Sequence, residues 1–143
     1  MGLFDAFDAS GSGLSAERLR MDVTAENLAN AQSTRTANGS GPYRRKTVAL
    51  EQAGAGAPTS FADSLQAARG VRVAGIVEDP TPLRKVYDPG HPDADKDGYV
   101  TMPNVNTVTE MTDLIGASRA YEANVTAMQT AKSMFTRTLD LLK

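Results

Sequence analysis

Apolar side chains recur every three or four residues through the last third of the chain. From Met111 onward the steps alternate between three and four without a break. The positions in this row are Met111, Leu114, Ser118, Tyr121, Val125, Met128, Lys132, Phe135, Leu139 and Leu142. This spacing is typical of the a and d positions of a coiled-coil helix. Thr107 and Glu110 have the spacing of an N-terminal capping box, so we expect the helix to begin near Val108.

A second row of apolar residues lies near the N-terminus at intervals of seven, namely Phe7, Leu14, Met21 and Leu28. It predicts a helix from about Ser15 to about Ala31, which ends before the polar run that starts at Gln32. An earlier start stays open. Gly11 and Gly13 argue against it, because each weakens a helix by about 1 kcal/mol relative to alanine.

Neither helix can bury its apolar row by itself. A helix from Val108 to Leu142 would be ~50 Å long at 1.5 Å per residue. Its row needs a partner helix, and the N-terminal row offers one. We therefore expect the two helices to lie side by side, either as an antiparallel pair or against neighbouring subunits.

The segment between the two helices differs in composition, because it holds nearly all the prolines and the strand-like runs. We expect a flexible Gly/Ala-rich loop at 51–60 and hairpin-forming strands at 43–50, 71–77, 83–87 and 99–102. The predicted fold class is α+β, with long N- and C-terminal helices pairing as a coiled coil and a small β-hairpin-rich middle section. The expected parts are residues 1–36, 37–106 and 107–143.

Composition and charge exclude several functions. The net charge of −2 lacks the basic surplus of a nucleic-acid binder. With no cysteine and only one histidine, His91, the chain can form neither a thiolate site nor a His-rich metal site. No apolar run approaches the ~18–20 residues of a membrane span. The N-terminus does not resemble a signal peptide, because Asp5 and Asp8 interrupt its apolar patch.

No group of residues predicts catalysis. His91 lies in a turn, and no nucleophile motif supplies it with a partner. There is no Gly-rich phosphate loop. The basic run Arg44–Lys46 is not extended by a basic stripe or an aromatic platform, so we interpret it as a charged strand edge or an ion-pairing contact with a neighbouring subunit. We therefore expect no enzyme activity, cofactor, small-molecule substrate or nucleic acid.

One acidic segment matches part of a metal-binding motif. Asp93–Gly98 has the D-x-D-x-D-G pattern of the first six positions of an EF-hand calcium loop. The twelfth position, where calcium needs a bidentate glutamate, is Asn104, and Pro103 stands where the second helix would begin. We therefore expect a solvated acidic turn and no metal site. A calcium-sensing module is kept as a third hypothesis.

Polar residues interrupt the C-terminal row at Ser118, Tyr121 and Lys132. Polar residues at a and d positions lower stability, but they set the register and the choice of partner. This pattern favours a subunit that packs into an assembly. The alternative is a coiled-coil adaptor that binds a soluble partner and never polymerises.

Several segments resemble sequence signatures of bacterial flagellar rod and hook proteins. Residues 26–34 are similar to the N-terminal signature of this family, in which a helix ends in an N-x-A-N run. Residues 114–124 are similar to its C-terminal signature, of which R-x-Y-E-A-N is the most specific part. The resemblance departs at Glu26, where asparagine is usual, and at Arg35–Thr36, which replace Thr-Gly. It covers essentially the whole chain through further segments at 41–46, 77–80, 87–92 and 98–106.

The resemblance implies a structural subunit of the proximal rod, the drive shaft that crosses the periplasm and transmits motor torque. In this family the terminal helices form a coiled coil in the inner tube, and the middle section lies outward. The implied partners are other copies of the chain, other rod proteins, and membrane-ring or export-gate proteins at the rod base. The resemblance further implies export by the flagellar type III apparatus without a cleaved signal peptide.

We expect residues of both terminal helices to form the assembly interface. Such contacts must be heterologous, so that head-to-tail addition continues instead of closing. The expected residues are Leu14, Met21, Asn27, Leu28 and Asn30 in the N-terminal helix, and Leu114, Tyr121, Glu122, Asn124, Val125, Phe135 and Leu139 in the C-terminal helix.

Overall fold

The computed structural model describes residues 3–36, 41–53 and 70–140, with side chains from residue 6 onward. The two long helices and the short strands between them confirm the predicted α+β class. Leu142 and residues 54–60 of the predicted 51–60 loop lie outside the described residues, whereas Glu51 and Gln52 belong to a strand, so the loop prediction is wrong for these two residues. In chain order the elements are α1 (Leu3–Ala29), β1 (Lys46–Gln52), β2 (Val71–Glu78), β3 (Arg84–Tyr87), β4 (Tyr99–Met102) and α3 (Thr107–Asp140).

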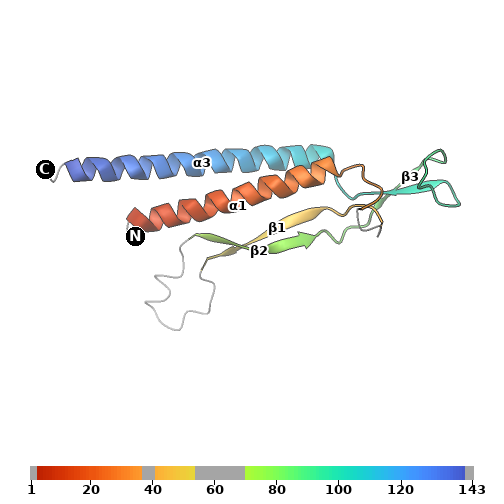
Figure 1. Ribbon diagram of the computed structural model, residues 1–143, viewed down its shortest axis with the longest axis horizontal. Helices are drawn as coiled ribbons and strands as arrows, with labels where there is room; N and C mark the ends of the chain where they lie inside the picture. Colours follow the sequence, from red (N-terminus) through yellow and green to blue (C-terminus); the bar gives the residue numbers. More distant parts are fainter. Residues whose placement is uncertain (1–2, 37–40, 54–69, 141–143) are drawn as a thin grey trace, which may run out of the picture.

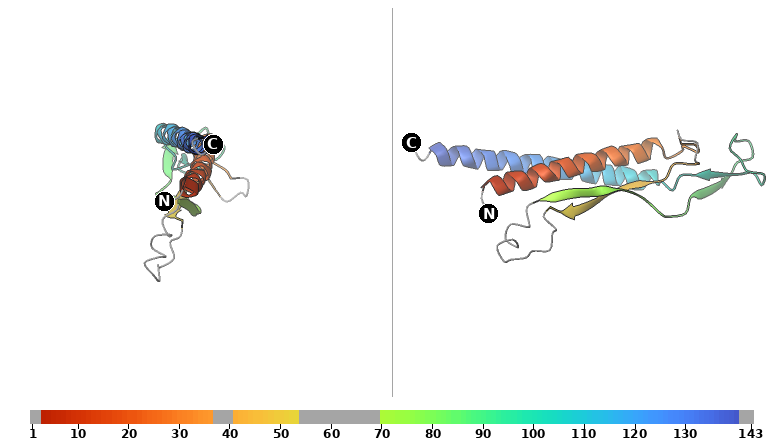
Figure 2. Two further views of the ribbon diagram at one scale, coloured as in Figure 1. Left: turned by 90° about the vertical axis from the view of Figure 1, so that its left-hand side faces the viewer. Right: turned by 60° about the horizontal axis from the view of Figure 1, so that its bottom comes forward.

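The molecule is elongated, because α1 and α3 run antiparallel along its length (Figure 1). The β1–β2 hairpin lies along α1, and the β3–β4 hairpin extends past the end of the helix pair at which α3 begins (Figures 1 and 2). At the opposite end, α3 extends past the beginning of α1. The helices therefore pair within one chain. Neither described helix is long and apolar enough to cross a membrane.

α1 begins at Leu3, well before Ser15. The earlier start that the sequence left open is therefore the one observed. It takes the helix through Gly11 and Gly13, where helical propensity is low. Packing against α3 outweighs this weakness, since most of the stability of helices in proteins comes from tertiary contacts. The end of α1 at Ala29 agrees with the expected stop before Gln32.

α3 begins at Thr107, close to the predicted position, but a different residue caps it. Asn106 Oδ1 accepts hydrogen bonds from the backbone N–H groups of Val108 at 3.0 Å and Thr109 at 3.4 Å. Asparagine suits this position because its side-chain oxygen satisfies N–H groups that lack a partner in the helix. The predicted capping box is therefore wrong. The Glu110 carboxylate instead bonds to residues outside α3.

The strands form two separate antiparallel hairpins. β1 and β2 pair from Lys46 opposite Glu78 onward, with a bulge at Ala74. A two-stranded hairpin alone is marginally stable in water, so it needs packing against another element. The β1–β2 hairpin finds this support on α1, where the Val71 N–H donates to Ser12 Oγ at 3.0 Å.

The buried core is small and lies where the helix pair meets the middle section. Ala31, Tyr43 and Val105 form a buried cluster beside the end of α1 and the start of α3. In the second hairpin, Tyr87 and Tyr99 form an edge-to-face pair with ring centroids 5.3 Å apart. Such aromatic pairs add stability beyond the area that they bury. The fold thus combines a long helix pair with a small buried core that attaches the middle section to it.

Candidate functional site: the helix pair and its outer face

The face of α3 that packs on α1 shares Leu114, Tyr121 and Met128 with the predicted row, but at the alternate positions the inner residue is the one just before the predicted residue. Met111 is 52% exposed and Lys132 is exposed, so neither is an inner position as predicted. At these alternate positions small or hydrogen-bonded side chains lie at the contact, and Met111 and Lys132 point outward. The inner positions are the buried Glu110 and Ala117 and the half-buried Leu114, Tyr121, Asn124, Met128 and Ala131.

Gly11 and Gly13 lie where α1 and α3 come close together. A Cβ atom at Gly13 would be 3.0 Å from Asn124 Nδ2, and one at Gly11 would be 3.9 Å from Met128 Cε. The predicted interface residue Asn124 therefore packs against α1 of its own chain. Both glycines weaken α1 locally, but they leave room for the side chains of α3.

A comparison of Gly116→Ala with Gly13→Ala tests whether Gly13 is closely packed while Gly116 is not. A Cβ atom at Gly116 in α3 would meet nothing within 4 Å. We expect this substitution to raise the free energy of unfolding by about 0.5–1 kcal/mol. Gly13→Ala should stabilise less, because Asn124 must move to admit the methyl group. Urea unfolding followed by circular dichroism measures both, and equal stabilisation would contradict the close packing at Gly13.

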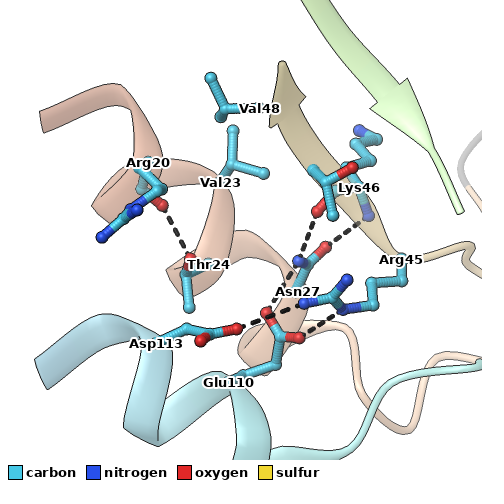
Figure 3. A pocket seen from close by; sticks show the side chains of 10 residues that line it. Arg20, Val23, Thr24, Asn27, Arg45, Lys46, Val48, Glu110 and Asp113 are labelled. Atoms are coloured by element: carbon cyan, nitrogen blue, oxygen red, sulfur yellow. Dashed lines mark hydrogen bonds and ion pairs between the residues drawn. The ribbon is translucent and has the colours of Figure 1, made fainter. Parts of the chain in front are cut away.

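Asn27 lies at the centre of a buried polar network (Figure 3). The residue is 1% exposed. Its Nδ2 donates to the Lys46 carbonyl at 2.8 Å and to Glu110 Oε2 at 2.9 Å. Its Oδ1 accepts from the Tyr43 hydroxyl and from the Lys46 N–H, both at 2.9 Å. All four hydrogen-bonding positions of the amide are therefore used inside the chain.

Glu110 connects α3 to this network. The residue is 1% exposed, and its Oε1 accepts a hydrogen bond from Arg45 Nε at 2.6 Å. Arg45 also pairs with Asp113 at 3.3 Å and with Asp79 at 3.5 Å. The hydrogen bond with Glu110 raises the pKa of the Arg45 guanidinium. Arg45 therefore forms these ion pairs within its own chain, and a contact of the basic run with a neighbouring subunit stays a prediction.

We call Asn27, Tyr43, Arg45 and Glu110 the polar joint. It brings together α1, α3 and the segment that leads into β1. Burial and the nearby Glu26 carboxylate raise the pKa of Tyr43 to about 12, so its hydroxyl stays protonated and donates to Asn27. Removing one member of a buried ion pair is costly, since it leaves the other charge without compensation. The joint thus fixes the middle section relative to both helices.

The Asp93–Gly98 turn uses its carboxylates within the chain. Asp93 accepts a hydrogen bond from Thr34 Oγ1 at 2.7 Å and forms an ion pair with Arg35. Asp95 Oδ1 accepts hydrogen bonds from the backbone N–H groups of Asp97 and Tyr99, both at 2.9 Å. Within the part of the chain that the structure describes, no three His, Cys, Asp or Glu side chains are grouped to hold a metal ion.

The contact between Asp93 and the segment after α1 predicts a pH dependence. The hydrogen bond from Thr34, together with the nearby Arg35, lowers the pKa of Asp93. A lowered carboxyl pKa means that the contact is fully formed above the ordinary value of about 3.9 and is lost as the pH falls through the lower folded-state value. We expect the NMR signals of Thr34 and Arg35 to be constant down to about pH 4 and to shift below it.

Asp93→Asn is the control for this titration, because it removes the charge and keeps an oxygen acceptor. The shift of the Thr34 and Arg35 signals should disappear in the variant. A wild-type transition centred above about pH 4 would contradict the pairing, since a free aspartate titrates near that pH.

The remaining predicted interface residues differ in accessibility. Asn27 lies wholly inside the polar joint. Glu122 and Leu139 are exposed on α3, as is Phe135. The side chains of these three residues are therefore accessible on the surface of the single chain. The half-buried residues, which the chain itself partly covers, are Leu14, Met21, Leu28, Asn30, Leu114, Tyr121 and Val125.

α3 carries a second apolar row, of which the predicted row contained only Met111. Val108, Met111 and Ile115 are 71%, 52% and 55% exposed. Steps of three and four place them on one side of the helix. Ile115 lies about 200° around the helix axis from the buried Ala117. We call these three residues the outer patch. Their spacing was visible in the sequence, but the longer neighbouring row shared Met111 and obscured it.

Family models match both ends of the chain. Residues 7–35 match the model described as flagella basal body rod protein. Residues 96–141 match the model described as the C-terminal part of flagellar basal body rod FlgEFG proteins. These ranges contain most of α1 and all of α3. The helix pair is therefore the part of the chain in which the family resemblance concentrates.

Relatives match over the full length of the chain. It is 45% identical to the flagellar basal-body rod protein FlgC of Borreliella burgdorferi, over 100% of this chain and 99% of that protein. It is 43% identical to FlgC of Bacillus subtilis over 100% of both chains. It is 44% identical to FlgC of Salmonella typhimurium, over 99% of this chain and 98% of that protein. The chain therefore belongs to the FlgC family of flagellar basal-body rod proteins, the structural subunits of the rod.

Proposed function

We propose that this chain assembles with its own copies and with other rod proteins into the proximal part of the flagellar rod. In this proposal the helix pair lines the inner tube, and residues 37–106 lie outward against neighbouring subunits. The completed rod acts as a drive shaft that carries motor torque through the periplasm. The chain contributes contacts to this shaft and performs no catalysis.

The outer patch is the observation that carries the proposal. Val108, Met111 and Ile115 lie on the side of α3 opposite its inner face, and each is more than half exposed. α1 covers only one side of α3, so the outer side has no partner within the described residues. A contiguous exposed apolar surface marks a site of interaction. A rod subunit needs such a surface for its neighbours.

The polar joint supports the part of the proposal that concerns torque. A force on the middle section passes to α1 through Asn27 and to α3 through Glu110. Breaking a buried ion pair by removing one partner costs about 3–5 kcal/mol, so such a joint resists local opening. A subunit of a rotating shaft needs this rigidity, because flexible linkers would absorb the rotation.

The proposal includes finer partners that follow from the sequence resemblance. At the base of the rod the chain would contact proteins of the membrane ring or of the export gate. It would reach the rod through the flagellar type III export apparatus without cleavage of a signal peptide.

Ile115→Asp tests the proposed assembly. Because Ile115 is more than half exposed, the free energy of unfolding should change by less than about 0.5 kcal/mol. Cells with this variant as their only copy should lose swimming in soft agar, and the variant should be absent from isolated basal bodies. Ile115→Leu is the matched control and should keep both. Normal swimming with normal incorporation of Ile115→Asp would contradict the assignment of the outer patch to assembly.

A further inference from the structure

We propose that the outer patch of one copy docks on one face of the β1–β2 hairpin of a second copy that points in the same direction. This inference rests on the proposed assembly and names one of its contacts. The occupant of the hairpin face is thus α3 of another copy of this chain. The argument uses the shape of the hairpin face, the spacing of residues on both surfaces, and their charges.

One face of the hairpin carries an exposed side chain at each of its ends. The bulge at Ala74 brings Val77, Gly75 and Arg72 onto the same face of β2, opposite Thr47, Ala49 and Glu51 of β1. Val77 is 53% exposed, and the side chain of Arg72 is 66% exposed. A Cβ atom at Gly75 would meet nothing within 4 Å. The face therefore offers an apolar end, a shallow gap and a charged end.

The outer side of α3 has the same sequence of features at a similar spacing. Met111 and Glu122 are eleven residues apart, which is about 16 Å along a helix. Val77 and Arg72 are separated by the bulge at Ala74 and lie opposite Thr47 and Glu51, which are four residues or about 13 Å apart along a strand. With Met111 over Val77, Ile115 lies over the gap at Gly75. The Glu122 backbone then lies about 3 Å beyond that of Arg72, a distance that the long arginine side chain can span.

Charge and direction agree with this register. Glu122 is acidic and exposed, and Arg72 is basic and exposed. Arg72 already pairs with Glu51 at 2.9 Å, but a guanidinium has five N–H donors and can serve a second carboxylate. On both surfaces the apolar end lies toward the start of α3 (Figure 1). Two copies must therefore point the same way, which a continuing heterologous assembly requires.

The outer patch cannot reach the hairpin of its own chain. Asp113 marks the side of α3 that faces the start of β1, because it pairs with Arg45. Met111 and Ile115 are each two residues from Asp113, or about 200° around the helix. α3 itself therefore separates the patch from the hairpin. A contact between the two surfaces has to join two copies.

Cysteine cross-linking tests the contact, since the chain has no cysteine of its own. The variant Met111→Cys/Val77→Cys is expressed as the only copy in swimming cells, and isolated basal bodies are oxidised. We expect a ladder of disulfide-linked multimers of this chain on a non-reducing gel. The matched control, Met111→Cys/Lys85→Cys, keeps one position and moves the other to exposed β3, and it should give no ladder.

The outcomes separate this contact from the wider proposal. No ladder, a cross-link to a protein of different mass, or a dimer from Met111→Cys alone would overturn the docking of α3 on the hairpin, although basal bodies that contain the chain would still support the rod assignment. A second variant pair checks the charges. Glu122→Arg should impair swimming and Arg72→Glu/Glu122→Arg should restore it, and failure of the double variant to improve on the single one would count against the register.

Discussion

Glu110→Ala is expected to lower the free energy of unfolding by about 3 kcal/mol. The substitution removes the carboxylate that pairs with Arg45 at 2.6 Å and accepts from Asn27 at 2.9 Å. The Asn27 amide then has a buried N–H without an acceptor, and the guanidinium loses its most buried partner. Asp113 and Asp79 compensate only in part, because both lie farther from Arg45. Urea unfolding followed by circular dichroism measures the loss.

Two further variants isolate the cause of this loss. Glu110→Gln keeps one acceptor oxygen but loses the charge, so we expect a smaller loss of about 1–2 kcal/mol. Glu122→Ala removes an exposed glutamate of the same helix and should cost less than about 0.5 kcal/mol. If Glu110→Ala were no more destabilising than Glu122→Ala, the polar joint would not hold the helices to the middle section.

Gly70→Ala is expected to cost about 2–3 kcal/mol for two reasons. Gly70 has a φ of +101°, a backbone conformation that residues with a side chain rarely adopt. In addition, its new methyl group would overlap Ser12 Oγ, the atom that accepts the Val71 N–H at 3.0 Å. The substitution would thus loosen β2 from α1. Thermal unfolding of the variant measures the expected loss.

Ser12→Ala/Gly70→Ala separates the two reasons. Removing the hydroxyl relieves the overlap but leaves the positive φ, so the double variant should lose less stability than the sum of the single losses. Gly41→Ala is a control for backbone conformation alone, because Gly41 has a φ of +103° and a Cβ atom there would meet nothing within 4 Å. Strict additivity of Ser12→Ala and Gly70→Ala would contradict the contact between these residues.

The sequence predicted the elements of the fold well, because their signals are local. The strand at 99–102 lies where it was predicted, and α3 begins close to the predicted Val108, although Asn106 caps it in place of the predicted capping box. The first residues of α1 were harder to predict, since Gly11 and Gly13 weaken a helix in isolation. The packing of α3 against these glycines outweighs the loss of helix stability that they cause. Such support from a distant segment has no local signal.

The inner face of the helix pair could not be read from hydrophobicity alone. An apolar row favoured Met111 over its neighbour Glu110, yet Glu110 is the buried residue and Met111 is half exposed. Burial of a carboxylate is tolerable only with a partner, and Arg45 is separated from it by 65 residues in sequence. The pairing is a property of the folded chain. The outer patch was missed for a different reason, because the longer predicted row also contains Met111.

Methionine oxidation in the free chain and in isolated rods tests the central claim most directly. Met111 belongs to the outer patch and is 52% exposed in the single chain, whereas Met102 is half-buried and serves as an internal reference. Mass spectrometry after brief exposure to peroxide gives the oxidation rate of each residue. The account predicts that Met111 reacts rapidly in the free chain and is strongly protected in the rod. Equal oxidation of Met111 in both forms would contradict the burial of the outer patch by assembly.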